Sequence, residues 1–319
     1  PQGRLASPHY HKMYTRETDK VVGSLERAIK LVGLKDGQTI SFHHHLRQGD
    51  YVVNLVLDTI ADMGIKNLTL AASALFPVHA PVIDHIKKGV IRRIECSMNG
   101  PIGKAVSTGE VELPTILRSH GGRVRAIQEG ALKIDVAFCA APCADAFGNM
   151  NGVNGPSACG PLGLFDIDSI CAEYVIAITD NLVDFPAFPI SIPGIRVDYV
   201  VQIDQIGDPN LITTGSLKVT QNPARLEIAR QVIEVMKASG YLKNGFSFQA
   251  GAGGISLAVT KFLGEYMAES GIRAGWILGG NTRFSVELLE KGYTPIIFDG
   301  QSFDKEAIAS LRDNPRHIE

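Results

Sequence analysis

A glycine-rich turn, Gly251-Ala252-Gly253-Gly254, is the stretch of this chain whose residue types most directly suggest chemistry. It lies between a short apolar stretch, residues 246–249, and an amphipathic stretch, residues 255–267, a pattern that predicts a strand, a turn and a helix. Glycines at such a junction let backbone N–H groups approach an anion or a carbonyl oxygen, because no Cβ stands in the way. The turn is therefore a candidate binding loop, although a plain tight turn of an α/β domain has the same pattern.

A second candidate, residues 41–50, reads Ser-Phe-His-His-His-Leu-Arg-Gln-Gly-Asp. Three adjacent histidines suggest a metal, but on a strand His43 and His45 face opposite to His44, and no HxxxH or carboxylate spacing follows. We therefore predict no metal site. One or two of these histidines and Arg47 are better suited to offer donors or positive charge to a carboxylate, because the arginine fork matches that group. Solvated loop residues are the alternative interpretation.

Two further polar stretches follow predicted strands. Residues 142–152 contain aspartate, glycine and the asparagines Asn149 and Asn151, which are residues that form turns, so a structural loop is the plain interpretation. Residues 279–283 place two glycines, an asparagine, a threonine and an arginine after another apolar strand. Each of these two stretches alone is a weak signal.

Alternating helices and strands position these stretches. Asn222 as N-cap and Pro223 as first helical residue predict a helix that ends near Gly240. Strand 246–249, helix 255–267 and strand 275–278 follow it. The first half of the chain has the same order, with helices expected at residues 20–32 and 51–63 and strands at residues 39–43, 68–72, 90–96, 124–127, 136–139 and 174–179.

This alternation predicts an α/β fold of two tandem open units, each with a mostly parallel sheet, that share one architecture. Residues 194–215 read as a strand and a linker, so we place the boundary near Gly215 and predict domains at 1–215 and 216–319. Ligands of such sheets bind beyond the carboxyl ends of the strands.

Composition narrows the class of protein. The chain has 319 residues, 45% of them hydrophobic and 20% charged, with a formal net charge of −2. This charge offers no basic patch for nucleic acid, and no apolar run approaches the roughly 20 residues that span a bilayer. The polar N-terminus has no signal-peptide core, which predicts a cytoplasmic protein, and five scattered cysteines without a CxxC pair predict reduced thiols.

Taken together and in this order, the stretches resemble the coenzyme A transferases: residues 145–149, the helix-then-glycine-loop unit 225–254, and the two-unit plan. Longer stretches resemble the alpha chains of citrate lyase, namely residues 41–50, 66–71, 119–124, 134–138, 253–260 and 301–304. The resemblance covers nearly all of residues 20–319. It implies two α/β units of the CoA-transferase type, the second truncated, because chains of that family continue well past Glu319.

The resemblance also implies an activity. Acetate on a thioester is exchanged for citrate, which gives a citryl thioester and free acetate. The thioester is carried by an acyl carrier (gamma) chain with a coenzyme-A-like prosthetic group, for which acetyl-CoA can substitute, and a beta chain then cleaves the citryl group. We therefore expect an oligomeric assembly, no covalently bound cofactor, and no nucleic-acid or membrane partner.

One departure from the wider family bears on the mechanism. Covalent coenzyme A transferases place a nucleophilic glutamate at a strand end of the second unit, just before an Asn-Gly pair. Here the comparable stretch, residues 278–282, has no carboxylate, and the nearest acids, Glu287 and Glu290, fall on the following helix. We therefore expect direct attack of a citrate carboxylate on the acetyl carbonyl in a ternary complex.

Such a route requires the protein only to position the two reactants and to stabilise the charge that develops on the thioester oxygen. We assign the oxyanion of the thioester to backbone N–H groups at Gly253, Gly254, Gly280 and Asn281. The residues predicted to bind substrate are His43, His45, Arg47, Asn149, Asn151, Gly251, Thr282 and Arg283.

Of three alternatives, the sugar-phosphate isomerases and the effector domains of sugar-responsive regulators share the α/β plan. A sugar-phosphate isomerase would leave the doubled architecture unexplained. A sugar-responsive regulator would need a helix-turn-helix module for which residues 1–20 are too short. A non-catalytic scaffold that docks an acyl carrier is the remaining one.

Overall fold

The structure is a computed structural model that describes residues 19–213, 218–251 and 253–319. Contacts divide the chain into two units: unit 1 is Pro1–Ala158 with Leu164–Ile212, and unit 2 is Cys159–Gly163 with Thr213–Glu319. The predicted boundary at Gly215 lies outside the described residues. Cys159–Gly163 belongs to unit 2 because Gly160, at φ +93°, lies directly against Ser302, where a Cβ would clash. Sequence order alone could not reveal this excursion.

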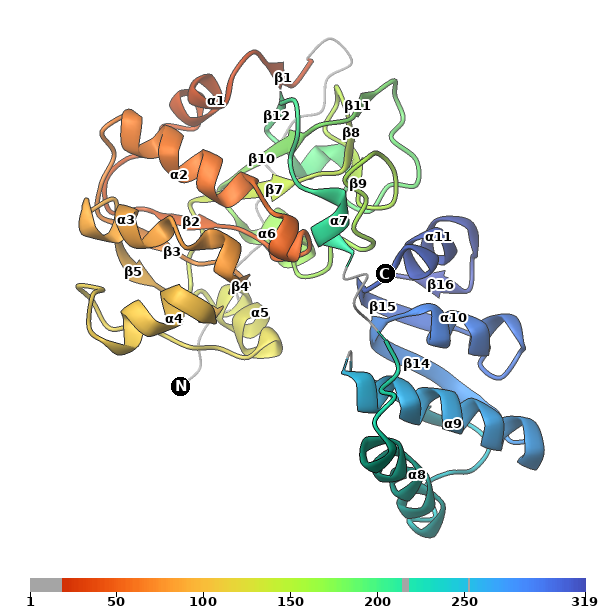
Figure 1. The fold of residues 1–319 in the computed structure, drawn as a ribbon. Helices are drawn as coiled ribbons and strands as arrows, with labels where there is room; N and C mark the ends of the chain where they lie inside the picture. The colour runs from red at the N-terminus through yellow and green to blue at the C-terminus, as the bar shows by residue number, and fades with distance from the viewer. Residues whose placement is uncertain (1–18, 214–217, 252) are drawn as a thin grey trace. The chain divides into compact units, whose positions relative to one another are not determined.

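The sheet of unit 1 has seven strands, all paired in parallel, in the order β1-β12-β10-β7-β2-β3-β5 (Figure 1). The strands are β1 (Val21–Val22), β2 (Thr39–Ser41), β3 (Leu68–Leu70), β5 (Ile91–Ile94), β7 (Val136–Ala140), β10 (Tyr174–Thr179) and β12 (Tyr199–Gln202). Every residue of β7 is buried, as expected for a parallel strand covered on both faces. The predicted parallel α/β architecture is therefore confirmed.

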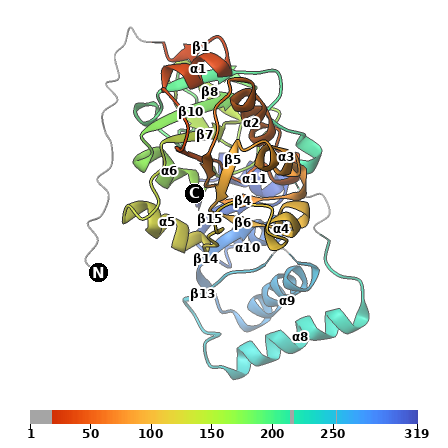
Figure 2. The same ribbon diagram turned by 90° about the vertical axis from the view of Figure 1, so that its left-hand side faces the viewer.

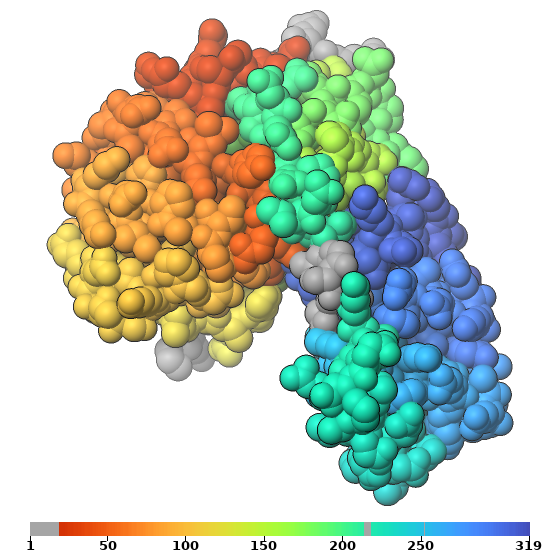
Figure 3. Space-filling model, in the orientation of Figure 1, coloured from red at the N-terminus to blue at the C-terminus, as the bar shows by residue number. Residues whose placement is uncertain are grey.

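Helices cover both faces of this sheet. Helices α1 (Leu25–Leu31), α2 (Val52–Asp62) and α3 (Val82–Lys87) lie on one face, and α5 (His120–Gln128) and α6 (Phe165–Cys171) lie on the other (Figure 2). The short helix α4 (Gly100–Ser107) follows α3. In the space-filling view, side chains of the orange segments, which include α2 and α3, lie over the first face (Figure 3). Between the layers, Phe42 and Phe138 stack with ring centroids 5.4 Å apart.

Smaller elements complete unit 1. They are β4 (Ala74–Leu75) paired with β6 (Ser97–Met98), the sheet of β8 (Cys143–Asp145), β9 (Met150–Asn151) and β11 (Leu182–Val183), the 3-10 turns η1 (Arg47–Gly49), η2 (Pro77–His79) and η3 (Gly194–Arg196), and α7 (Pro209–Ile212).

Unit 2 has a four-stranded parallel sheet in sequential order: β13 (Phe246–Phe248), β14 (Ala274–Asn281), β15 (Ile297–Ser302) and β16 (His317–Ile318). Its helices are α8 (Pro223–Ala238), α9 (Gly254–Ser270), α10 (Arg283–Glu290) and α11 (Lys305–Asp313). The predicted N-cap is confirmed, because the Asn222 side chain accepts a hydrogen bond from the Arg225 N–H and Pro223 follows it. Ile233 of α8 packs against Leu263 and Met267 of α9.

The sequential strand order of this sheet determines which of its faces the helices cover. Right-handed crossovers between neighbouring strands place α9, α10 and α11 on one face. Side chains that alternate with the buried Ile277 and Ile297 point to the other face, and Leu278 and Phe298 lie side by side there, both partly exposed. None of the described helices has the combination of length and apolar character that crossing a membrane requires.

Three predicted elements differ from the structure. Residues 124–127, expected to be a strand, lie in α5, because Ser119 caps the helix by accepting the Gly122 N–H. The helix predicted from residue 20 begins only at Leu25, since Val21 and Val22 pair with β12. Strand β14 continues through Asn281, so the glycine pair 279–280 lies inside the strand instead of after it.

Candidate functional site

The carboxyl ends of β2 and β7 form the topological switch point of unit 1. From β2 the chain proceeds through β3 and β5 to one edge of the sheet, and from β7 through β10 and β12 to the other. Open α/β sheets bind ligands at such a point, because the two loops that follow the central strands diverge there. The loop after β2 is His43-His44-His45-Leu46-Arg47, so the structure places the histidine stretch where a ligand is expected.

A buried ionic network anchors the start of this loop. Both terminal nitrogens of the Arg123 guanidinium donate to the Asp168 carboxylate at 2.7 Å, and Arg123 Nη2 also donates to Ser41 Oγ and Ala71 O. Asp168 accepts from Ser41 Oγ at 2.6 Å and pairs with His43 Nε2 at 2.9 Å. The Arg123 guanidinium and His43 hold the pKa of Asp168 below its ordinary value against the effect of burial, while burial lowers the pKa of His43 to about 4. Sequence reasoning missed Arg123 and Asp168, and it assigned His43 to substrate, whereas the His43 ring is enclosed here.

His45 and Arg47 lie further along the same loop, and both are buried. His45 Nε2 lies 2.7 Å from Ala140 O at the end of β7, while His45 Nδ1 has no partner among the described residues. Burial lowers the pKa of His45, and a neutral imidazole that donates its Nε2–H to Ala140 O has only the Nδ1 lone pair left, so His45 offers neither a further donor nor the positive charge that the residue types allowed. Arg47 is held with φ at 53°, in the left-handed region that few residues other than glycine adopt. The loop therefore fixes Arg47 in a specific backbone conformation at the switch point.

His44 differs from its two neighbours because it is only partly buried. Its backbone N–H donates to Ser73 Oγ at 3.0 Å and its Nδ1 lies 2.6 Å from the same oxygen. Its ring meets Phe76 at 5.9 Å and His120 at 5.4 Å between centroids. The rings of His43 and His45 stack with their centroids 6.4 Å apart. His44 therefore faces the other way from its two neighbours, as predicted, although the loop is not a strand.

Asn149 and Asn151 lie in the loop region around β8 and β9 and use their amides inside unit 1. Asn149 donates to Asp145 at 2.8 Å and accepts the Gly194 N–H at 2.8 Å. Asn151 donates to Ala187 O and accepts the Val153 N–H. Both side chains are buried, so they hold this loop in shape, and the geometry gives no support to their assignment to substrate.

In unit 2 the glycine turn leads into the N-terminus of α9. Gly253 is the N-cap of this 17-residue helix, and among the described residues no side chain accepts a hydrogen bond from the first-turn N–H groups. A Cβ at Gly253 would meet nothing within 4 Å, whereas one at Gly254 would lie 3.1 Å from Lys218 O. Gly251 is exposed. The turn thus presents backbone donors on an open side at Gly253, as a binding loop requires.

The end of β14 lies beside this turn, since β13 and β14 pair in parallel. Packing explains why both residues at the end of β14 are glycines. Gly279 has φ +111° and lies against Gln249, and a Cβ on Gly280 would clash with the Phe303 ring. Asn281 is fully buried and donates to Gly279 O and Asp299. The geometry therefore explains Gly280 and Asn281 as packing residues and gives no support to an oxyanion role.

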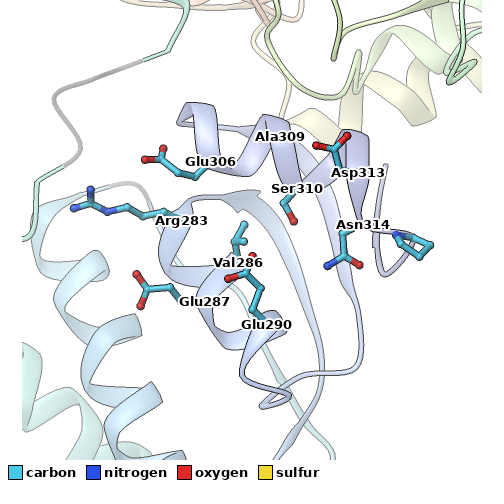
Figure 4. A pocket seen from close by; sticks show the side chains of 10 residues that line it. Arg283, Val286, Glu287, Glu290, Glu306, Ala309, Ser310, Asp313 and Asn314 are labelled. Atoms are coloured by element: carbon cyan, nitrogen blue, oxygen red, sulfur yellow. The ribbon is translucent and has the colours of Figure 1, made fainter.

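Thr282 and Arg283 begin α10. The Thr282 hydroxyl accepts the Phe284 N–H as the N-cap. Arg283 lies at the rim of an open pocket between α10 and α11 that is also lined by Glu287, Glu290 and Glu306 (Figure 4). These carboxylates make the pocket acidic, so it disfavours a citrate carboxylate and gives no support to Arg283 as a citrate ligand.

Within residues 19–213, 218–251 and 253–319, no three His, Cys, Asp or Glu side chains come together as a metal site would require.

Comparison with known proteins gives concordant results. Residues 18–319 match the family described as citrate lyase, alpha subunit (CitF). The chain is 50% identical to the citrate lyase alpha chain of Klebsiella pneumoniae over 301 residues, which cover 94% of this chain and 59% of the relative. It is 48% identical to the citrate lyase alpha chain of Escherichia coli (strain K12) over 301 residues, with the same shares covered. The chain thus spans about three fifths of the length of the curated relatives that it matches.

Two solved structures extend the comparison. A proposed alpha subunit of citrate lyase from Streptococcus mutans, in complex with citrate, superimposes with a TM-score of 0.95 at 47% identity, covering 100% of this chain and 63% of that one. The alpha subunit of a malonate decarboxylase from Acinetobacter baumannii superimposes with a TM-score of 0.66 at 18% identity, covering 91% of this chain and 52% of that one, which shows a shared fold only.

Proposed function

Because the chain belongs to the citrate lyase alpha-subunit (CitF) family, we propose that its full-length protein exchanges the acetyl group of a thioester for citrate, yielding a citryl thioester and acetate. The observation that carries this proposal is the likeness, along the whole chain, to the protein solved with citrate. The thioester carrier is the coenzyme-A-like group of an acyl carrier chain, or free acetyl-CoA, which acts as a co-substrate. The partners are that carrier chain and the beta chain that cleaves the citryl group, in an oligomeric lyase assembly.

We assign two protein regions to the reactants. The Arg47 guanidinium at the switch point of unit 1 binds a citrate carboxylate, for which its planar fork is suited. Backbone N–H groups at the start of α9, from Gly253 onward, stabilise the oxyanion of the thioester, each for roughly 3–4 kcal/mol. His43 and His45, being enclosed, hold the Arg47 loop in place and do not contact substrate.

The reaction we propose is direct transfer. A citrate carboxylate oxygen attacks the acetyl carbonyl and expels the thiolate, which leaves a mixed citryl-acetyl anhydride. The thiolate then attacks the citryl carbonyl and expels acetate, so every bond formed is matched by one broken. Residues 278–282 at the end of β14 carry no carboxylate, and Glu287 and Glu290 lie on α10, in the acidic pocket. Holding both reactants in attack geometry can contribute roughly 7–11 kcal/mol without an enzyme nucleophile.

Exchange should therefore proceed without a covalent enzyme intermediate. With borohydride or hydroxylamine added during turnover, mass spectrometry should find no modified glutamate, and initial rates should require citrate and acetyl-CoA together instead of a ping-pong sequence. A modified Glu287 or Glu290, or another modified acid of the full-length chain, would contradict direct transfer and leave the exchange itself intact.

Replacing Arg47 by lysine should raise the citrate KM about 10-fold while the KM for acetyl-CoA stays within about 2-fold, because a point charge replaces a bidentate fork. Steady-state kinetics with each substrate varied in turn measures both. Arg92→Lys is a matched control, since Arg92 lies on the surface and pairs with Glu112. Unchanged values for both substrates would show that the carboxylate pocket is elsewhere.

The proposed function is tested by incubating the full-length protein with acetyl-CoA and labelled citrate. The proposal requires acetate to be released in step with labelled citryl-CoA. A protein that binds the acyl carrier but releases no acetate would instead be a docking scaffold.

A further inference from the structure

The three adjacent histidines have different surroundings, and only His44 is placed to meet a ligand. The His43 ring faces Asp168 and is 2% exposed. His45 is turned toward Ala140 O and is also buried. His44 keeps part of its ring accessible, at the carboxyl ends of β2 and β3, beside the first residue of α5. The residue that the motif leaves open to the switch point is therefore the middle histidine, which sequence reasoning did not select.

The hydrogen bonds of His44 determine which ring nitrogen carries the proton. Ser73 Oγ accepts the backbone N–H of His44, and the described residues offer its hydroxyl proton no acceptor except His44 Nδ1, at 2.6 Å. Nδ1 is thus the acceptor, and a neutral imidazole then carries its proton on Nε2. Nε2 has no hydrogen-bond partner within the described part of the chain, and it is not enclosed. His44 therefore presents one N–H donor outward.

The surroundings keep this donor neutral. Burial, followed by the neighbouring His43 and His120, lowers the pKa of His44 to about 3. Phe76 provides an apolar wall on the same ring. A donor fixed in such a partly desolvated recess forms a stronger hydrogen bond than one in water. A neutral imidazole held in one tautomer can polarise a substrate oxygen without exchanging a proton.

We propose that His44 is a substrate-contacting residue, whose Nε2–H donates a hydrogen bond to an oxygen of the acyl substrate, with Ser73 as the positioning residue that fixes the tautomer. This inference rests on the proposed acyl exchange. The oxygen belongs either to a citrate carboxylate or to the acetyl thioester, because both offer an oxygen that accepts a hydrogen bond. A KM effect confined to citrate or to acetyl-CoA would distinguish them.

Matched substitutions in the full-length protein test the donor. His44→Gln keeps an N–H near the position of Nε2, whereas His44→Asn keeps polarity near Nδ1 and loses the outward donor. We expect about 10²- to 10³-fold lower kcat/KM for His44→Asn and His44→Ala, and partial recovery in His44→Gln. Ser73→Ala should have an intermediate effect, since Nδ1 can then hold the proton. His85→Gln, which removes a histidine that pairs with Asp58 on α2, is the control and should leave the rate unchanged.

A merely structural histidine predicts a different pattern, namely equal losses in all His44 variants together with lower melting temperatures. That result, or wild-type rates in His44→Asn, would overturn the proposal. An exchange-inactive wild type would refute the proposed function instead. In that case ¹⁵N NMR of His44 still tests the inference. The spectrum should show a neutral Nε2–H tautomer from pH 5 to 8, and its resonance should shift on addition of citrate or acetyl-CoA. An Nδ1–H tautomer, or a resonance that responds to neither compound, overturns the inference.

Discussion

Replacing Asp168 by asparagine is expected to lower the free energy of unfolding of unit 1 by about 3–5 kcal/mol. The substitution removes the negative charge that compensates Arg123 in this part of the described structure, where the two side chains are 3% and 0% exposed. An unpaired guanidinium in the interior loses its hydration without recovering the loss from a carboxylate. Ser41 and His43 bond to different oxygens of this carboxylate, and asparagine keeps only one oxygen acceptor, so the histidine loop loses part of its anchor as well.

Hydrogen exchange measures this effect where it arises. Amides of β7 and β10 lie in the centre of the unit 1 sheet, and their protection factors should fall roughly 10²- to 10⁴-fold. Trp276, the single tryptophan of the chain, lies in unit 2, so its fluorescence should be unchanged and serves as an internal reference. The matched control is Asp166→Asn on the same helix, whose carboxylate is 60% exposed and pairs with Arg196. This variant should lose no more than about 1 kcal/mol. Equal losses at the two positions would contradict a special role for the buried pair.

The architecture was predictable because it follows from local patterns. Alternating apolar strands and amphipathic helices gave parallel sheets, and Asn222-Pro223 gave the start of α8. Errors arose where tertiary pairing overrides local preference. Val21 and Val22 lie just before a helical pattern but join β12, because the edge of the sheet offers them partners from residues far along the chain. Residues 124–127 look like a strand, yet the Ser119 cap starts a helix there that buries Arg123.

The candidate site was predictable only in its outline. Histidines and an arginine after a strand, and glycines before a helix, can be recognised from their types and positions. The roles of individual residues depend on partners that spacing does not show: Arg123 and Asp168 are 45 residues apart and compensate each other's charge. Gly280 resembles a binding glycine in sequence, but the ring of Phe303 explains it. For His44, a serine 29 residues away decides which nitrogen carries the proton.

Replacing Gly253 by valine is expected to reduce acyl exchange at least 100-fold and to leave the fold intact. Gly253 has φ −76° and ψ 153°, which any residue adopts, and a Cβ there would meet nothing within 4 Å. The fold therefore gives no reason for glycine at this position. A branched side chain would instead occupy the open side of the turn, where we place the thioester oxygen, and would separate it from the N–H donors at the start of α9. Loss of one such donor typically costs 10²- to 10³-fold in kcat.

Three variants separate this explanation from a structural one. Gly253→Ala should cost less than Gly253→Val, because a single methyl group obstructs less of the approach. Gly23→Val is the matched control, since a Cβ at Gly23 also meets nothing within 4 Å and Gly23 belongs to unit 1, not to the glycine turn, so exchange should be unchanged. Gly254→Val is expected to lower the melting temperature, because its Cβ would press on Lys218 O at 3.1 Å. If Gly253→Val keeps near-normal turnover with an unchanged melting temperature, the thioester does not approach this turn. The donors for its oxyanion must then be sought elsewhere in the full-length protein.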